Sequence, residues 1–314
     1  MKCLVTGAAG FVGSHLCESL LNLGFSVTGI DSFTDYYSRE LKKKNLLSLL
    51  KKPQFEFIQA DINQIQLQDP IKNIDALFHL AAQAGVRASW GDNFSVYTKN
   101  NIESTQKILE TCKKYKIKKI VYASSSSVYG NTPDLPMKET SPLCPYSPYG
   151  VTKLAAENLC SLYYKNYGLP IVSLRFFTVY GPRQRPDMAF HKFLKAIGEN
   201  RPIEIYGTGD QTRDFTFIND IISATISAAE KGKPGEIYNL GRGKQEKLSE
   251  IFPLLKKICG KKVRIKKTNT QKGDVKHTLA SISKAKKDLD YSPQFTLQQG
   301  LEKEWVWIKD IYSF

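Results

Sequence analysis

The chain has 314 residues, of which 41% are hydrophobic and 11% aromatic, and its formal net charge is +15. This length and composition predict an ordinary globular protein with one large domain or two modest ones. No apolar run reaches the ~18 residues of a membrane-spanning helix, and the lysines occur in short scattered groups without a zinc-finger or basic-helix motif. We therefore expect neither a membrane nor a nucleic acid as a partner.

The six cysteines form no Cys-x-x-Cys pair and have no histidine-rich partner. Buried thiols are the expectation for such cysteines, and no metal site is predicted. The sequence enters an apolar strand within its first five residues and shows no signal-peptide pattern. From this we expect a cytoplasmic protein.

A glycine-rich turn follows the first predicted strand, Cys3–Thr6, and precedes an amphipathic stretch over residues 14–23. Glycines at the point where a strand turns into a helix are typical of a dinucleotide site. Gly7 allows the tight turn, Gly10 lets the backbone approach a pyrophosphate, and Gly13 permits close helix packing. The free N–H groups of the helix N-terminus would then face the phosphates.

The second predicted strand, Phe25–Ile30, ends at Asp31, about twenty residues after the glycines. A carboxylate at this position can accept hydrogen bonds from both adenosine ribose hydroxyls and repels a 2′-phosphate. The pattern therefore favours NAD over NADP as the cofactor.

Strands and helices continue to alternate along the chain. Strands are predicted at Phe55–Gln59, Ala76–His79 and Ile117–Ala123, with a helix from about Phe94 to Tyr115. This rhythm predicts an α/β fold with a doubly wound parallel Rossmann sheet and ligands at the carboxyl ends of the strands. At those ends Asp61 is a candidate for the adenine and Ala81 for the wall of the cofactor cleft, although a turn residue and simple close packing explain each equally well. His79 is interpreted as a packed core histidine.

Tyr149 and Lys153 are four residues apart, so on a helix their side chains share one face. A lysine cation at about 4 Å, in a medium of effective dielectric ~20, would favour the phenolate by roughly 4 kcal/mol, or ~3 pK units. Tyr149 would then act as a general base at neutral pH. Ser125, in the hydroxyl-rich loop after the strand Ile117–Ala123, is expected to lie beside it.

After a strand at Ile171–Leu174 the regular alternation ends. Loops rich in Gly, Pro and Asp predict a smaller C-terminal lobe that covers the cleft. We assign residues 1–175 to the NAD-binding domain, with residues 214–240 returning to it near Phe217, and residues 176–213 and 241–314 to an interleaved substrate-binding lobe.

These motifs resemble the extended short-chain dehydrogenase/reductases, in particular the nucleotide-sugar epimerase and dehydratase branch. The resemblance covers nearly the whole chain and rests on residues 6–16, 79–87, 124–130, 149–153 and 175–190. It implies that Tyr149 is the base, that Lys153 orients it and the nicotinamide ribose, and that Ser125 holds the reacting sugar hydroxyl. It also implies a homodimer and a cofactor site lined by Gly7, Gly10, Phe11, Val12, Gly13, Asp31, Asp61, Ile62, Leu80, Ala81, Ala82, Asn101, Tyr149, Lys153 and Phe176.

By the same resemblance the C-terminal lobe grips a uridine diphosphate. Arg213 is then placed on the diphosphate, Ile205 and Tyr206 against the base, and Asp274 near the ribose, while Arg87 also faces the substrate. Ser126, Ser127, Thr178 and Arg185 are candidates for contacts with a sugar carboxylate.

Residues in two short segments discriminate within the branch. Similar decarboxylases carry a glutamate, and 4,6-dehydratases an Asp-Glu pair, where this chain has Ser126 and Ser127. Phe177-Thr178 replaces the asparagine usual in UDP-galactose epimerases, and the following residues 185–190 look like those of UDP-glucuronate 4-epimerases. The resemblance thus implies NAD-dependent conversion of UDP-glucuronate to UDP-galacturonate through a 4-keto intermediate. UDP-glucose or UDP-N-acetylglucosamine 4-epimerisation and UDP-glucuronate decarboxylation stay open as alternatives.

Overall fold

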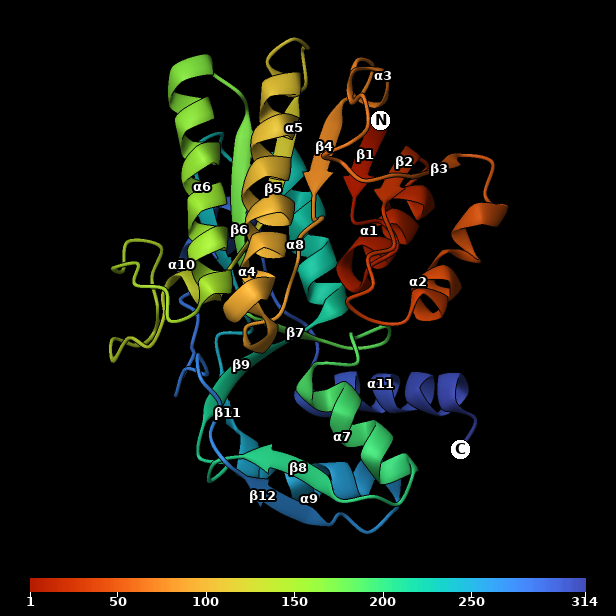
Figure 1. The fold of residues 1–314 in the computed structure, drawn as a ribbon, viewed down its shortest axis with the longest axis vertical. Coiled ribbons are helices and arrows are strands. Elements are labelled where there is room, and N and C mark those ends of the chain that lie inside the picture. Colours follow the sequence, from red (N-terminus) through yellow and green to blue (C-terminus); the bar gives the residue numbers. More distant parts are fainter.

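The computed structural model describes residues 1–314 and contains the parallel sheet that the sequence predicts, with seven strands. The strand order is β10-β6-β5-β4-β1-β2-β3, in which the order reverses beside β1 (Figure 1). The strands are β1 (Lys2–Thr6), β2 (Ser26–Asp31), β3 (Phe55–Gln59), β4 (Ala76–His79), β5 (Lys119–Ser125), β6 (Ile171–Phe176) and β10 (Ile237–Leu240).

Helices cover both faces of this sheet because successive strand residues point to opposite sides. Leu4, Leu77 and Ile120 belong to the core on one face, which is closed by α5 (Ser104–Cys112) and α6 (Pro148–Tyr167). Cys3, Phe78 and Val121 belong to the core on the other face, beneath α1 (Phe11–Asn22) and α8 (Ile218–Lys231). A strand buried on both faces has to be apolar throughout, which is why these segments read as continuous apolar runs.

The second lobe lies below the carboxyl ends of the main strands in Figure 1. A three-stranded sheet joins β11 (Gln245–Lys247), β9 (Thr212–Phe217) and β7 (Thr178–Tyr180), while β8 (Ile203–Tyr206) pairs with β12 (Ile265–Thr268). Around them lie α7 (Ala189–Gly198), α9 (Leu248–Cys259) and α11 (Leu297–Tyr312).

The chain returns to the main sheet directly after Phe217, where α8 begins, and β10 follows as the edge strand of that sheet. Phe217 ends β9 inside the three-stranded sheet, and only α8 and β10 belong to the main one. A period-two apolar pattern identifies a strand but carries no information on which sheet the strand joins, and β9 pairs with β7 in the smaller sheet.

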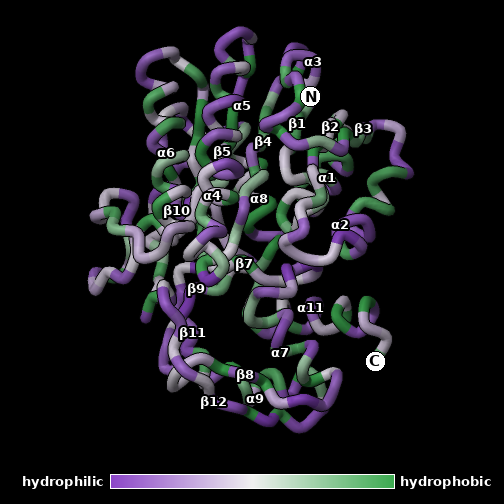
Figure 2. Tube along the Cα trace, in the orientation of Figure 1, coloured by the Kyte–Doolittle hydropathy of each residue, from purple (hydrophilic) through white to green (hydrophobic).

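Short elements complete the chain. These are α2 (Arg39–Leu46), α3 (Gln68–Ile71), α4 (Phe94–Tyr97), α10 (Ser283–Leu289) and 3-10 turns at residues 49–51, 87–89, 91–93 and 126–128. The helix predicted over residues 94–115 is present, but residues 98–103 form a π-helical turn between α4 and α5. The lysine-rich α2 and β12 are largely hydrophilic (Figure 2). None of the helices combines the length and the hydropathy that crossing a membrane would require.

Candidate active site

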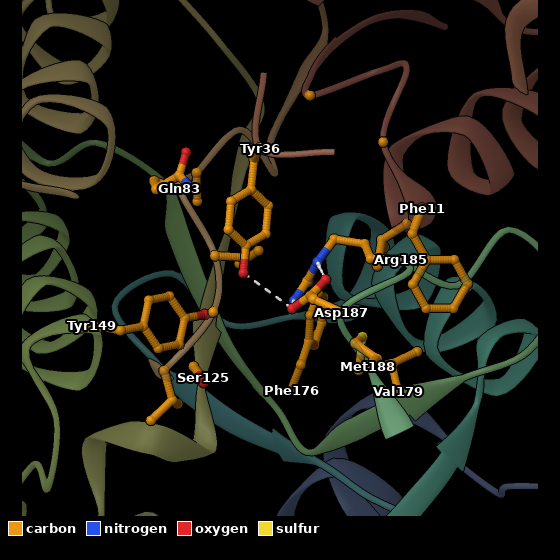
Figure 3. A pocket seen from close by; sticks show the side chains of 18 of the residues that line it. Phe11, Tyr36, Gln83, Ser125, Tyr149, Phe176, Val179, Arg185, Asp187 and Met188 are labelled. Atoms are coloured by element: carbon orange, nitrogen blue, oxygen red, sulfur yellow. Dashed lines mark hydrogen bonds and ion pairs between the residues drawn. The ribbon is translucent and has the colours of Figure 1, made fainter. Parts of the chain in front are cut away.

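A cleft of about 750 Å³ opens between the carboxyl ends of the main strands and the second lobe. The carboxyl ends of the parallel strands all lie along this edge of the sheet, and the reversal of strand order beside β1 leaves a crevice there. Every residue that the sequence predicts for the site lines this cleft except Asn101. Figure 3 shows its central part, with Phe11 at one end and Ser125 and Tyr149 at the other.

The glycine turn is built so that no side chain would fit. Gly7 has φ +74°, a conformation that favours glycine, and a Cβ there would lie 2.9 Å from the backbone nitrogen of Ala81. A Cβ on Gly13 would lie 2.0 Å from the carbonyl oxygen of Gly7. Both glycines are therefore required by backbone packing, as the sequence predicts.

The N-terminus of α1 offers free donors to the cleft. Its N-cap is Gly10, which provides no side-chain cap, and no acidic residue stands in the first turn. The amides of Phe11 and Val12 donate to no other group of the protein. Together with the positive end of the helix dipole, this arrangement fits an anionic pyrophosphate.

Asp31 ends β2 and is largely buried at the adenosine end of the cleft. Its two carboxylate oxygens accept hydrogen bonds from the amides of Ala9, at 3.1 Å, and Phe33, at 2.8 Å. Burial raises the pKa of Asp31, whereas these backbone donors and the charge of Lys42 act to lower it. Each carboxylate oxygen keeps further acceptor capacity for a ribose hydroxyl.

Asp61 and Asn101 are tied into their own surroundings. Asp61 accepts from the amide of Asn63 at 2.9 Å and pairs with Lys99 at 3.3 Å, so it is a turn residue that also lines the cleft. Asn101, in the π-helical turn, is buried behind the wall. Its amide exchanges hydrogen bonds with the backbone of Gln83 at 2.7 and 3.0 Å and donates to Thr152 at 2.9 Å. Asn101 therefore holds the loop after β4 against α6 and does not itself face a ligand.

The position of Tyr149 follows from the start of α6. Pro148 begins the helix, and the Ser147 hydroxyl caps it by accepting from the amide of Gly150 at 3.1 Å. A Cβ on Gly150 would lie 2.6 Å from the carbonyl oxygen of Ser127. The glycine next to Tyr149 thus lets the helix approach the serine turn closely, which brings the phenol to Ser125.

The electrostatics of Tyr149 differ from the prediction. Burial raises the pKa of its phenol, and the groups that act to lower it are Ser125, through a hydrogen bond, and the charge of Arg185. We predicted that Lys153 would lower this pKa, and that is wrong for the free site. Burial also lowers the pKa of Lys153, to about 8, and its ammonium lies 4.7 Å from the ring centre of Tyr122. The spacing of two residues shows that they share a helix face but not how deeply both are buried.

A buried charge network supports the serine turn from behind. Arg175 on β6 donates twice to Glu157 on α6, at 2.6 and 3.1 Å, and Ser124 donates to the same carboxylate at 2.6 Å. Arg175 also donates to the hydroxyl of Tyr129 at 2.7 Å. The ends of β5, β6 and α6 are thereby locked together, so Ser125 and Lys153 stand on a rigid base.

Four residues predicted for the nucleotide form one cluster in the cleft. The Arg87 guanidinium lies 4.0 Å from the ring centre of Tyr206 and bonds the carboxylate of Asp274 at 2.8 Å. Arg213 donates through one nitrogen to the carbonyls of Thr212 and Lys276. Two guanidinium groups against one carboxylate leave a net positive charge, which suits a diphosphate.

The structure adds three residues to the site that the sequence did not single out. The Nε and Nη2 atoms of Arg185 donate to the two carboxylate oxygens of Asp187, both at 2.9 Å, and the Tyr36 hydroxyl donates to Asp187 at 3.1 Å (Figure 3). Tyr97 packs edge-on to Tyr149 with ring centres 6.2 Å apart. The short spacing of Arg185 and Asp187 could have suggested that these two residues pair. Nothing in the sequence could have suggested the contact of Tyr36, which lies 151 residues from Asp187.

These features fit an NAD molecule. The glycine turn and the free amides of α1 would hold its pyrophosphate, and Asp31 its adenosine ribose. At the other end, the buried Lys153 ammonium donates to no group of the protein, which leaves its donors for the nicotinamide ribose.

Comparison with known proteins agrees with this geometry. Residues 3–241 match the NAD dependent epimerase/dehydratase family. Over 98% of this chain and 96% of the other, the sequence is 44% identical to a UDP-glucuronate 4-epimerase of Thermodesulfobacterium geofontis. It is also 45% identical, over 100% of this chain and 99% of the other, to a Bacillus subtilis protein named as an uncharacterized UDP-glucose epimerase, YtcB.

Among solved structures, the fold matches the UDP-glucuronic acid 4-epimerase of Bacillus cereus in complex with UDP-glucuronic acid and NAD. The TM-score is 0.97 at 48% identity, over 99% of this chain and 100% of the other.

Proposed function

This chain belongs to the NAD-dependent epimerase/dehydratase family, and on that premise we propose that it is a UDP-sugar 4-epimerase whose substrate is UDP-glucuronate. The reaction inverts C4 and yields UDP-galacturonate. The observation that carries the choice of sugar is the cationic Arg185 in the same cleft as Ser126, Ser127 and Thr178, close enough to Tyr149 to influence its pKa. A carboxylate at C6 is the substrate group that needs such a set of donors.

Tyr149 carries the proton transfers in this proposal. Its phenolate, which the raised pKa makes the minor form in the free site, takes the proton from the O4 hydroxyl of the sugar, and Ser125 holds that hydroxyl by a hydrogen bond. Held by the glycine turn, Asp31 and Lys153, NAD would supply the acceptor for the hydride of C4 and, once reduced, the donor to the opposite face. Tyr149 then gives the proton back to O4. The reaction has no net oxidation, because every electron pair and proton that leaves the sugar returns to it.

The cleft also has to protect the substrate. With C4 oxidised, the carboxylate on C5 is β to a ketone, and CO₂ leaves easily when the bond from C5 to the carboxyl carbon stands perpendicular to the carbonyl plane. The hydroxyls of Ser126, Ser127 and Thr178 and the guanidinium of Arg185 can hold the carboxylate away from that orientation. The Nε and Nη2 atoms of Arg185 bond Asp187, and its Nη1 remains for the substrate.

The experiment is to incubate the purified protein separately with UDP-glucuronate and UDP-glucose and to resolve the products by chromatography. UDP-galacturonate from the first reaction and little UDP-galactose from the second are expected. Preferential conversion of UDP-glucose would favour the second candidate, a UDP-glucose 4-epimerase, to which the name of the Bacillus subtilis relative points. UDP-pentose as the main product would indicate a decarboxylase.

A homodimer is the assembly that we propose. Trp90, Phe94, Tyr146 and Val151 are 38 to 53% exposed and surround a hollow at the start of α6, and a contiguous apolar cluster of this kind marks a surface for a protein partner. Light scattering should give the mass of two chains for the wild type and of one for Val151→Asp. A wild-type mass of one chain would rule out the dimer.

A further inference from the structure

A hydrogen-bonded bridge joins the two lobes across the cleft. The Tyr36 hydroxyl, in the loop after β2, donates to Oδ2 of Asp187 at 3.1 Å. Asp187 in turn accepts from Nε and Nη2 of Arg185, both at 2.9 Å. Although burial acts to raise it, the Arg185 charge holds the pKa of Asp187 below its usual value, so the acceptor of this bridge is a carboxylate.

The loop after β4 leaves room for this bridge. Gly85 has φ +100°, and a Cβ there would lie 1.9 Å from the hydroxyl oxygen of Tyr36. The hydroxyl therefore reaches Asp187 only because residue 85 has no side chain.

The segment that carries Asp187 is also fixed to α1. The carbonyl oxygen of Pro182 accepts from His15 at 2.9 Å, and Arg183 bonds Glu18 at 3.0 Å. This segment, residues 181–188, is thus held at one end on α1 and at the other, through Asp187, on the loop that follows Asp31. It forms a strap beside the glycine turn.

The strap stands where a dinucleotide has to pass. Figure 3 shows Tyr36 and Asp187 between Phe11 on one side and Tyr149 on the other. An NAD molecule held by Asp31, the amides of Phe11 and Val12 and the Lys153 ammonium would occupy the same stretch of the cleft. Its path in or out is therefore crossed by the bridge.

We propose that the hydrogen bond between Tyr36 and Asp187 is a latch that retains NAD, and that it opens each time the dinucleotide enters or leaves. The proposal depends on NAD binding alone and not on which sugar the enzyme converts. A redox cycle that closes within one turnover has no need to exchange its cofactor, and a latch of this kind keeps the site loaded.

Tyr36→Phe tests the latch, because it removes the hydroxyl and leaves the Arg185–Asp187 pair intact. A latch slows entry and exit alike, so its loss should raise both the association and the dissociation rate constants of NAD about ten-fold or more, with the dissociation constant changed by less than about three-fold. Association is followed by protein fluorescence after rapid mixing, and dissociation by transfer of NAD to an excess of a dehydrogenase that consumes it. No sugar nucleotide is present in either assay.

Tyr37→Phe is the matched control, since the neighbouring Tyr37 hydroxyl is buried and bonds no protein group. We expect its rate constants to equal those of the wild type. Unchanged rates in Tyr36→Phe would overturn the latch. So would a rise in the dissociation rate alone, which is the sign of a lost direct contact with NAD, or equal changes in both variants. Thermal unfolding of both NAD-free variants verifies that the fold is retained.

Discussion

Replacing the buried His79 should reduce the loss of unfolding free energy that occurs as the pH falls below 7. His79 ends β4 beneath the cofactor loop, and its two ring nitrogens contact the hydroxyls of Thr6, at 2.8 Å, and Thr105, at 3.0 Å. Burial, aided by the charge of Lys153, lowers the pKa of His79 to about 3. The imidazole is therefore neutral in the folded protein throughout the range in which an unfolded histidine takes up a proton.

The sign and size of the effect follow from proton linkage. Below pH ~6.5 the unfolded chain binds a proton that folded His79 does not, so stability is lost as the pH falls from ~6.5 toward the folded value. Between pH 7 and pH 5 the loss from one such histidine is about 2 kcal/mol. His191 behaves in the same way, because burial lowers its pKa to about 4.

The assay is urea unfolding of NAD-free protein at pH 7 and pH 5, compared between wild type and His79→Gln. Glutamine retains hydrogen-bonding groups but does not titrate. The fall in the free energy of unfolding from pH 7 to pH 5 should be smaller by about 2 kcal/mol in the variant. His277→Gln, at an exposed position, is the control and should fall as much as the wild type.

Other buried groups make the folded protein more stable as the pH falls, which is opposite to the effect of the histidines. The effect of His79 alone is therefore seen only in the difference between wild type and variant. Burial raises the pKa of Asp214 to about 6 and that of Glu304 well above its usual range. Asp214 therefore gains a proton in the folded state between pH 7 and pH 5 and offsets part of the loss. An equal fall in wild type and His79→Gln would refute the reasoning.

Three further outcomes concern catalysis. Tyr149→Phe should leave NAD binding nearly unchanged and lower turnover by ~10² or more, the usual worth of general base catalysis, and turnover within a few-fold of wild type would remove Tyr149 from the mechanism. Thr178→Ala should weaken UDP-glucuronate turnover by ~1.5 to 3 kcal/mol and raise the share of UDP-pentose among the products, whereas a wild-type rate without extra pentose would contradict the carboxylate clamp. Purified protein should contain NAD and epimerise without added cofactor, and accumulation of NADH in proportion to product would instead indicate a dehydrogenase.

The sequence predicts those parts of the site that lie within one short segment. The glycine turn and the Tyr149–Lys153 pair are set by spacing on a single strand, turn or helix, and the structure has them where the pattern requires. The parallel sheet follows from the alternation of apolar runs and amphipathic helices, and six of its seven strands agree with the predicted segments to within about two residues at each end.

Burial, by contrast, is not a local property. The spacing of Tyr149 and Lys153 suggested a lowered phenol pKa, but the packing of α6 against the serine turn removes both groups from water and raises it. The same holds for Asn101, which the resemblance placed at the cofactor. Its side chain turns inward because the π-helical turn aligns it with the backbone of Gln83.

The pairing of Tyr36 with Asp187 depends on the closure of the second lobe onto the first, which no pattern of either segment encodes. Once formed, it explains how Arg185 serves two purposes. Asp187 takes Nε and Nη2 and so fixes the plane of the guanidinium, while Nη1 has no protein acceptor. A guanidinium held along one edge loses little further freedom when a substrate carboxylate binds the remaining nitrogen, so the pairing with Asp187 also preorganises Arg185 for the sugar carboxylate.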